Sequence, residues 1–330
     1  MGWLRKKKKP KSDIVSVRGA MVLEDLIECC DGKSNPIKFF SADEICKATD
    51  NLNEANHITE LSDFGYKWYS GKNENHGVIL IKKALHRFND YQEGKFCRDI
   101  AVSSMVSGHK SFLKLVGCCL EFKYPVMVYH GVKKHYKLDD ISEEPWKRKM
   151  KIAEDIATAF AYLHTAFPRP FVYRNFSPKK IILDDDGVAR LSDFSCCVSI
   201  PQGETFVKVD RIVGRFGYMD HNYKMSGLVS EKTDVFAIGI VMKNLLPTEE
   251  ETEEEGDISE QEICQMKAFA MLSLRCVGLK GEVPTMVEVA KELKKIQRYL
   301  HNDSSSPSSE THFDSPQDIS SSSVVLSNQT

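Results

Sequence analysis

The stretch that decides the fold runs from Phe171 to Ile200 and reads FVYRNFSPKKIILDDDGVARLSDFSCCVSI. It contains two short apolar runs, around Ile181 and Leu191, on either side of the turn-forming sequence DDDG. Runs of this kind, bounded by Asp and Gly, are typical of short strands joined by a tight turn. Two groups of residues with polar side chains lie just outside this hairpin. Tyr173-Arg174-Asn175 precedes it, and Asp193-Phe194-Ser195 follows it.

This order of residues resembles the catalytic and metal-binding loops of protein kinases, which read H-R-D-x-x-x-x-N and, after a hairpin, D-F-G. Further landmarks follow the kinase order. The run ILIK ends in Lys82, which matches the strand-3 lysine, and residues 234–239 resemble the helix that anchors the C-lobe. The resemblance covers residues 47–300. It implies an α+β, bilobal protein-kinase-like fold with a small β-rich N-lobe and a larger α-helical C-lobe.

Two positions depart from the kinase pattern in ways that oppose phosphoryl transfer. Asn175 stands where the pattern has the aspartate that serves as general base, and an amide cannot take the proton of the substrate hydroxyl. General-base help is worth about 10²–10⁴-fold in rate. Lys180 stands at the second metal-ligand position, where a cation repels Mg²⁺ instead of binding it. We therefore expect no catalytic residues, with Asn175 and Lys180 marking degenerate positions.

The glycine-rich loop of the nucleotide site is also depleted. It falls in residues 61–71, LSDFGYKWYSG, where only Gly65 precedes Gly71 and the bulky residues Tyr66 and Trp68 crowd the loop. Such a loop needs glycines so that backbone N–H groups can approach phosphates. The sequence therefore predicts a weakened phosphate cradle.

Two residues of the nucleotide site survive. Lys82 and Asp193 are the candidates for a residual contact with nucleotide, and Asp193 is the candidate for a residual metal ligand. The alternative is that both are inherited scaffold. No cofactor is required, and weak binding of ATP stays open. The carboxylate that pairs with Lys82 also stays open, between Asp99 and Glu93.

Composition limits the classes of protein that this chain can belong to. It has 330 residues, 42% of them hydrophobic, and a net charge of -2, which fits a folded domain with tails and excludes a fully disordered chain. The near-zero charge signals no nucleic-acid partner. The ten cysteines lack zinc-site spacing, and neither a signal peptide nor a membrane span is apparent. We expect a cytoplasmic protein with free thiols.

The chain divides by composition into a kinase-like body and flanking segments. The basic start, MGWLRKKKKPKS, predicts a disordered tail with weak attraction to an anionic membrane surface, and hence a peripheral position at the plasma membrane. The role of the acidic stretch 247–257 stays open. The predicted segments are a basic tail over 1–19, a helical extension over 20–46, an N-lobe over 47–131, a C-lobe over 132–300 and a Ser-rich disordered tail over 301–330.

Three further stretches narrow the resemblance to one group of plant proteins. FFSADEICKATDNL, at residues 39–52, resembles the lead-in of plant receptor-like cytoplasmic kinases. LVGCCLEF and AYLHTAFPRP, at 115–122 and 161–170, resemble the HopZ-ETI-deficient-related pseudokinases. The resemblance implies an adaptor in plant innate immunity. Members of that family dock on the leucine-rich-repeat domain of a coiled-coil, nucleotide-binding immune receptor and recruit receptor-like cytoplasmic kinases that bacterial effectors have modified.

Two sets of residues are candidates for these partner contacts. The first lies on an amphipathic helix predicted over residues 20–30, whose apolar side chains pack either on the domain or on the receptor. The second lies in the activation segment, residues 193–222, where basic side chains could meet phosphate-like charge. The candidates are Met21, Leu23, Leu26 and Ile27 for the receptor, and Arg211 and Arg215 for the modified kinase.

A rival hypothesis from another class is a low-activity serine/threonine protein kinase that uses ATP. Lys82 and Asp193 keep this alternative open, with Lys180 replacing part of the lost metal charge. Asn175 is the feature that most opposes it, because the residue at the base position cannot accept a proton.

Overall fold

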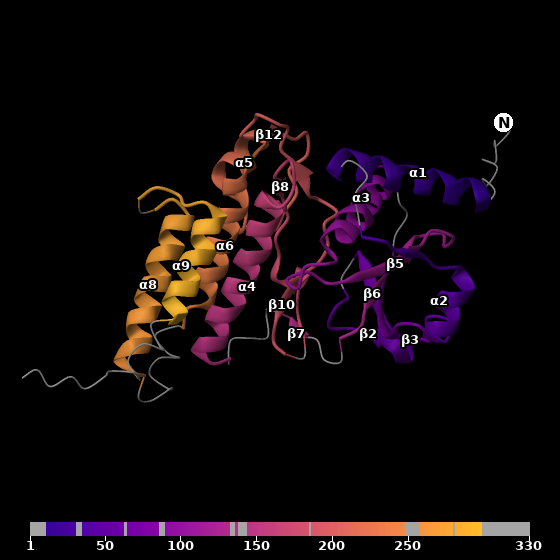
Figure 1. Ribbon diagram of the computed structural model, residues 1–330, viewed down its shortest axis with the longest axis horizontal. Helices are drawn as coiled ribbons and strands as arrows, with labels where there is room; N and C mark the ends of the chain where they lie inside the picture. The colour runs from indigo at the N-terminus through magenta and orange to yellow at the C-terminus, as the bar shows by residue number, and fades with distance from the viewer. Residues whose placement is uncertain are drawn as a thin grey trace, which may run out of the picture.

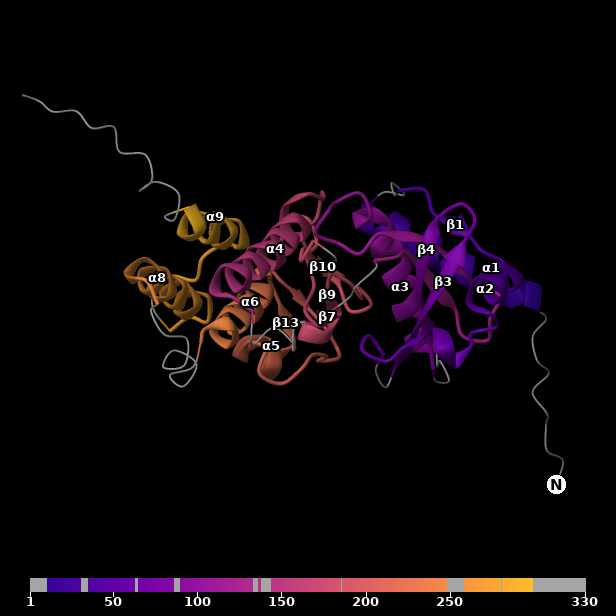
Figure 2. The same ribbon diagram turned by 90° about the horizontal axis from the view of Figure 1, so that it is seen from below.

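A computed structural model describes residues 11–30, 35–62, 65–85, 90–132, 136–137, 144–184, 186–247, 258–279 and 281–298. The chain folds into two lobes that lie side by side (Figure 1). The N-terminal lobe holds a twisted sheet with helices beside it, and the C-terminal lobe is mostly helical, as Figure 2 shows from a second direction. This arrangement confirms the predicted α+β, bilobal kinase-like fold.

The sheet of the N-lobe has six strands among the described residues, in the order β1-β5-β6-β4-β3-β2. Its centre is β4, whose β-branched run GVILIKKA is buried along most of its length. The turn between β3 and β4 has Gly77 with φ +65°, in the left-handed region that glycine enters at no steric cost. The strands are β1 (Lys38–Phe39), β2 (His57–Ile58), β3 (Tyr66–Asn73), β4 (Gly77–Ala84), β5 (Leu115–Cys119) and β6 (Val126–His130).

The N-lobe begins earlier in the chain than the predicted boundary at residue 47. β1 pairs with β5 in parallel, which adds Lys38 and Phe39 to the sheet. Helix α2 (Ala42–Thr49) follows, and it begins with a capping box between Ser41 and Glu44. A short 3₁₀ turn, η1 (Glu54–Asn56), then leads into β2.

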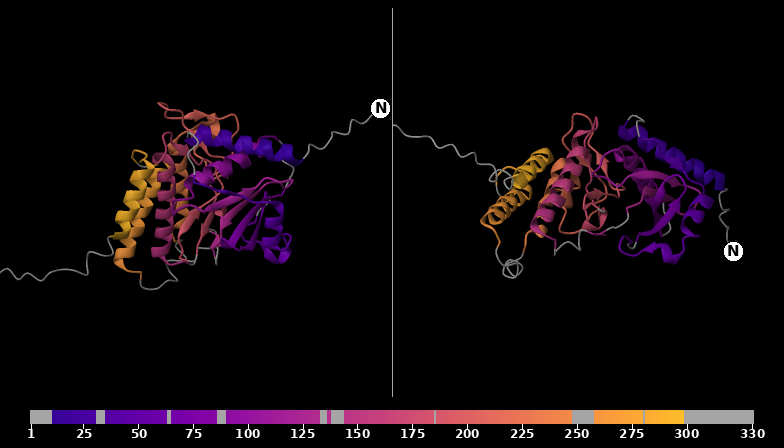
Figure 3. Two further views of the ribbon diagram at one scale, coloured as in Figure 1. Left: turned by 45° about the vertical axis from the view of Figure 1, so that its right-hand side comes forward. Right: turned by 60° about the horizontal axis from the view of Figure 1, so that its bottom comes forward.

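Helix α1 (Lys11–Cys30) also begins earlier than predicted, so residues 11–19 are helical and the predicted disordered tail over 1–19 is wrong for this part. The helix lies along α3 (Asp90–Val106), as Figures 1 and 3 show. Arg18 anchors this part of α1 to the N-lobe. Its buried side chain donates to the backbone carbonyls of Leu120, Phe122 and Lys123, at 2.7, 2.8 and 3.0 Å. These carbonyls belong to the connection from β5 to β6, which a sequence pattern local to α1 cannot report.

The C-lobe is built around α4, which packs against α6 and α9, with α8 outside them (Figure 2). The hairpin predicted from the decisive stretch is present as β9 and β10, joined by the DDDG turn. The main elements of the C-lobe are α4 (Trp146–Thr165), η3 (Pro178–Lys180), β9 (Ile181–Leu183), β10 (Ala189–Leu191), α5 (His221–Ser226), α6 (Glu231–Leu245), α8 (Glu260–Cys276) and α9 (Met286–Arg298).

Short strands complete the C-lobe around the activation segment. β8 (Phe171–Val172) pairs with β11 (Val198–Ser199), β12 (Val207–Lys208) pairs with β13 (Leu228–Val229), and β7 (Tyr136–Lys137) joins β9. The basic residues at 1–10, most of the acidic stretch at 248–257 and the Ser-rich segment at 301–330 lie outside the described residues, and the predictions made for them stay predictions.

Candidate functional site

The loop at the catalytic position is held in place by one buried carboxylate. Asp234 of α6 accepts the backbone N–H groups of Tyr173 and Arg174, at 2.7 and 2.8 Å. His164 of α4 lies 3.0 Å from the same carboxylate. Arg174 takes φ +67°, a conformation that costs a non-glycine residue free energy unless its surroundings hold it there. The structure therefore keeps the shape of a catalytic loop, whatever its chemistry.

Asn175 occupies the base position but has no group that could accept a proton from a substrate. Its side-chain Nδ2 lies 3.4 Å from Sγ of Cys196, to which it donates. Its backbone carbonyl accepts a hydrogen bond from Nζ of Lys180 at 2.7 Å. Because Lys180 follows within one short turn, η3, it folds back toward the same loop. Both degenerate positions therefore lie together, as the kinase pattern predicts.

The partner of Lys82 is Asp99 of α3. Nζ of Lys82 donates to Oδ2 of Asp99 at 2.8 Å, and both side chains are buried. The other candidate, Glu93, instead accepts from Nε of Arg18 at 2.5 Å. Oδ1 of Asp99 also accepts the backbone N–H of Phe194 at 2.8 Å, so this one carboxylate links the sheet, α3 and the start of the activation segment.

Asp193 lies between two lysines from the two lobes. Its Oδ2 is 3.1 Å from Nζ of Lys180, and its Oδ1 is 3.6 Å from Nζ of Lys82. Burial alone would raise the pKa of Asp193, but the charges of Lys180 and Lys82 outweigh it and hold the pKa well below its usual value. Burial alone would lower the pKa of Lys82, but Asp193 and Asp99 outweigh it and raise that pKa well above its usual value. Asp193 and Lys82 are therefore both charged at neutral pH.

This cluster does not fit the Mg²⁺–nucleotide pair that the kinase fold implies. A magnesium site needs oxygen ligands, and the position that should supply the second one carries the ammonium of Lys180, in contact with Asp193. Within the ranges that the structure describes, no group of three or more His, Cys, Asp or Glu side chains is placed to hold a metal ion. The charged side chains of this cluster stabilise one another. The cluster lacks the second metal ligand that phosphoryl transfer in kinases requires.

The crowding predicted for the glycine-rich loop is present in β3. The ring of Tyr66 lies 4.1 Å from Nζ of Lys82, and its hydroxyl has its pKa raised by burial. Trp68 is buried and stacks on Tyr129 of β6, with ring centroids 5.5 Å apart. These aromatic residues take up space next to Lys82, where glycines would leave the backbone open.

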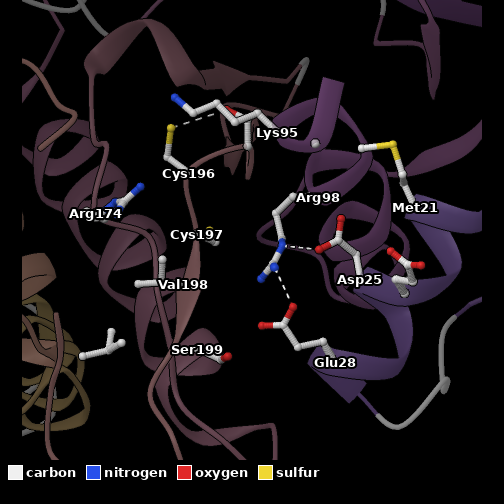
Figure 4. Close-up of a pocket in the computed structure, with 14 residues that line it drawn as sticks. Met21, Asp25, Glu28, Lys95, Arg98, Arg174, Cys196, Cys197, Val198 and Ser199 are labelled. Atoms are coloured by element: carbon white, nitrogen blue, oxygen red, sulfur yellow. Dashed lines mark hydrogen bonds and ion pairs between the residues drawn. The ribbon is translucent and has the colours of Figure 1, made fainter. Parts of the chain in front are cut away.

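A cavity of about 530 Å³ lies between α1, α3 and the activation segment (Figure 4). Arg174 and Cys196 line it from the C-lobe. From the N-lobe side, Arg98 of α3 pairs with Asp25 and Glu28 of α1, at 2.6 and 2.8 Å. The sequence reasoning missed this pairing, although the two carboxylates stand three residues apart on one face of a predicted helix.

The four candidate receptor contacts are divided by the structure into two pairs. Leu23 and Ile27 are exposed, at 55% and 56%. Met21 and Leu26 are partly buried and pack against the hydrophobic core of the N-lobe. The predicted single apolar face is therefore split between packing within the chain and exposure to solvent.

The two candidate arginines of the activation segment are both exposed. The guanidinium of Arg215 lies 5.8 Å from the centre of the Tyr218 ring. Exposed apolar side chains lie around them in the sequence. These are Phe206, Ile212, Phe216 and Met225, of which Phe216 is 80% exposed.

The match to known proteins agrees with this geometry. The protein kinase domain model matches residues 64–313, more than half of the chain. The fold and the degenerate site together define the class of protein: a pseudokinase, with a kinase domain whose catalytic positions have been replaced. None of the helices that the structure describes is long and apolar enough to cross a membrane.

Curated relatives identify the family within that class. The chain is 66% identical over 355 residues to the inactive serine/threonine-protein kinase ZRK12 of Arabidopsis thaliana, covering 100% of this chain and 90% of that protein. It is 51% identical to the non-functional pseudokinase ZRK15 of the same plant, covering 89% and 93%. It is 41% identical to the non-functional pseudokinase ZED1, also from Arabidopsis thaliana, covering 88% and 98%. The chain belongs to the ZRK family of pseudokinases.

Proposed function

We propose that this pseudokinase is an adaptor in plant innate immunity. In this role it docks on the leucine-rich-repeat domain of an immune receptor and recruits receptor-like cytoplasmic kinases that effectors have modified. The family resemblance supplies the kinds of partner. The supporting observation in this chain is that Leu23 and Ile27, one helical turn apart, are exposed on a helix that is otherwise anchored to the N-lobe.

The anchoring of α1 makes this pair suitable for recognition. Val22 directly precedes Leu23 in the sequence, but its side chain is buried in the N-lobe core. Arg18 fixes the helix one turn further back through its three carbonyl contacts. A partner that binds Leu23 and Ile27 therefore meets side chains on a fixed backbone, which lowers the entropic cost of binding.

The activation segment is the proposed contact for the modified kinase. Phe216 offers a large apolar side chain, and Arg211 and Arg215, which precede it in the sequence, add positive charge. Guanidinium groups bind phosphate-like anions through paired hydrogen bonds, so a kinase that carries an added phosphate-containing group presents matching chemistry. We place both contacts in the cytoplasm, with the basic start of the chain contributing a weak attraction to the membrane surface.

The test is co-purification from plant tissue, with partners identified by mass spectrometry. The full chain is compared with a Leu23→Glu/Ile27→Glu variant, which should lose the leucine-rich-repeat receptor while its melting temperature is retained. The matched control is Val17→Glu, which alters another exposed residue of α1 about 120° around the helix from Leu23. Unchanged recovery of the receptor by the double variant would contradict the proposed dock.

The second contact is tested separately with Arg211→Glu/Arg215→Glu. This variant should keep the receptor and lose the modified kinase, because the two surfaces lie on different elements. The matched control is Lys243→Glu, a surface charge reversal in α6, which should keep both partners. If the arginine variant recovers both partners as well as the unchanged chain does, the activation segment is not the contact.

A further inference from the structure

We infer that the side chains of this protein fill its own nucleotide site. Trp68 occupies the place of the nucleotide base, and Lys180 takes the place of the metal ion. The two lobes are therefore held together without ATP or Mg²⁺. The inference concerns residues that the adaptor role does not use. It is carried by one apolar cluster and one charge cluster, which lie next to each other across the gap between the lobes.

The apolar cluster occupies the place of the base. Trp68 of β3 stands directly opposite Lys82 of β4 in the strand register, so both side chains project from the same face of the sheet. A nucleotide in this fold lies beneath the glycine-rich strands and next to that lysine. Trp68 fills this space with a side chain that is 5% exposed and stacked on Tyr129.

The same cluster reaches the other lobe. Ile182 of β9, on the C-lobe hairpin, belongs to the same buried hydrophobic cluster as Trp68, Tyr129 and Leu80 of the N-lobe. These side chains therefore join the sheet to the hairpin as continuous packing. A planar base could enter only by displacing Trp68, which would break this packing and expose apolar surface to water.

The ammonium that Lys82 would offer to phosphates is enclosed by other side chains. Its ammonium is 2.8 Å from Asp99 and 3.6 Å from Asp193. The ring of Tyr66 lies over it at 4.1 Å, a favourable position for a buried cation. A phosphate would have to displace this aromatic ring before it reached Nζ.

Lys180 supplies the positive charge that a metal ion would otherwise bring to Asp193. Its Nζ lies 3.1 Å from Asp193 and 2.7 Å from the carbonyl oxygen of Asn175. Together with Lys82 and Asp99 the cluster has two amino groups and two carboxyl groups, and no side chain in it is more than 15% exposed. A buried carboxylate without a partner is strongly destabilising, so Lys180 allows Asp193 to stay ionised in the absence of metal.

The first experiment measures nucleotide binding by the full, unmodified chain. Thermal unfolding is followed with ATP or ADP at millimolar concentration, with and without Mg²⁺. The expected result is an unchanged melting temperature, because a ligand that binds the folded state must raise it. A melting temperature that rises with nucleotide concentration would overturn the inference.

The second experiment reopens the site with Tyr66→Gly/Trp68→Val. This variant should gain a nucleotide-dependent rise in melting temperature. The matched control is Tyr69→Val, which removes a buried aromatic from the same strand but from the hydrophobic cluster on the other face of the sheet. A folded Tyr66→Gly/Trp68→Val protein that still ignores nucleotide would show that these side chains are not what excludes it.

The third experiment tests the charge cluster and does not depend on nucleotide. Lys180→Met should lower the melting temperature, whereas Lys179→Met, at the exposed neighbouring lysine, should not. Adding Asp193→Asn to Lys180→Met should cost less than Asp193→Asn costs alone, because the two groups compensate each other. Strictly additive losses would overturn the role of Lys180. Should Lys180→Met fail to fold, Lys180→Arg serves in its place. It keeps the positive charge and should therefore fold.

Discussion

Nζ of Lys180 lies 3.1 Å from Oδ2 of Asp193, so an ion pair occupies the place where a kinase aligns two metal ligands. One replacement thus has two effects. It removes an oxygen ligand for Mg²⁺. It also places a positive charge beside the buried carboxylate of Asp193, which a metal ion would otherwise stabilise. The backbone around the pair is held in a left-handed conformation at Asp193, with φ +63°, and Phe194 donates to Asp99.

The stabilisation from Asp193 should depend on pH. Its pKa is held well below the usual value, because Lys180 and Lys82 outweigh the effect of burial. A carboxyl whose pKa is lower in the folded state stabilises it at pH values above its unfolded pKa of about 3.9, and this contribution is lost as the pH falls toward the folded pKa. Asp193→Asn should therefore cost about 3 kcal/mol at pH 7 and progressively less below about pH 4.

Urea unfolding at a series of pH values measures this difference in the free energy of unfolding. The control is Glu74→Gln, which removes an ion pair with Lys47 whose two side chains are 85% and 80% exposed. That substitution should leave the free energy of unfolding at pH 7 nearly unchanged, because the pair is fully exposed to solvent. A cost of Asp193→Asn that stays constant from pH 7 to pH 3 would rule out the ionised pair.

Arg18→Ala should destabilise the chain by about 3 kcal/mol, because it leaves several buried acceptors without donors. The guanidinium donates to three backbone carbonyls and to Glu93. The loss is measured by urea unfolding at pH 7, with the exposed Lys47→Ala as the matched control. If Arg18→Ala and Lys47→Ala lose the same small amount, α1 is not anchored to the lobe through this residue.

Restoring the base alone should not restore catalysis. Asn175→Asp returns a carboxylate to the base position, but Lys180 and the aromatic residues of β3 still oppose metal and nucleotide. Transfer of radioactive phosphate from ATP to a general protein substrate should stay at the level of an Asn175→Asp/Lys82→Ala control. Incorporation above that control would show that the site still admits ATP and metal, and it would contradict the filled nucleotide site.

The cysteines should differ sharply in reactivity. Burial raises the pKa of Cys97 and Cys118 to about 12, so their thiols are protonated at neutral pH and closed to reagents. Cys264 of α8 is exposed. In native protein, iodoacetamide at pH 7.5 should label Cys264 first, as peptide mass spectrometry would measure. Equal labelling of all three before unfolding would contradict the described packing.

Much of the fold could be predicted because kinase motifs and local patterns carry it. The β9–β10 hairpin, β4 and the capping box at Ser41 are each encoded within a few neighbouring residues. The start of α1 could not be predicted in this way. Arg18 is stabilised by carbonyls more than 100 residues further along the chain, and no periodicity within residues 11–30 signals that.

The candidate site shows the same limit. Asn175 and Lys180 were found because each departs from a motif with fixed spacing. The choice between Asp99 and Glu93 depended on how α3 is rotated against the sheet, which the sequence did not specify. Leu23 and Leu26 are the same residue type on one predicted helix, so the sequence does not distinguish them. Only the position of α3 beneath α1 buries one side chain more than the other.

The contacts of Arg18 have a consequence for how the protein is made. The ribosome synthesises α1 before the carbonyls that receive the guanidinium of Arg18, which belong to residues 120–123. At about 5–20 residues per second, the helix waits roughly 5–20 seconds before the groups it binds have been synthesised. During that interval its buried side chains, Val22 among them, have no finished lobe to cover them. Helix α1 is thus made well before the groups that hold it in place, and the nascent chain exposes an amphipathic segment to chaperones until residues 120–123 have emerged.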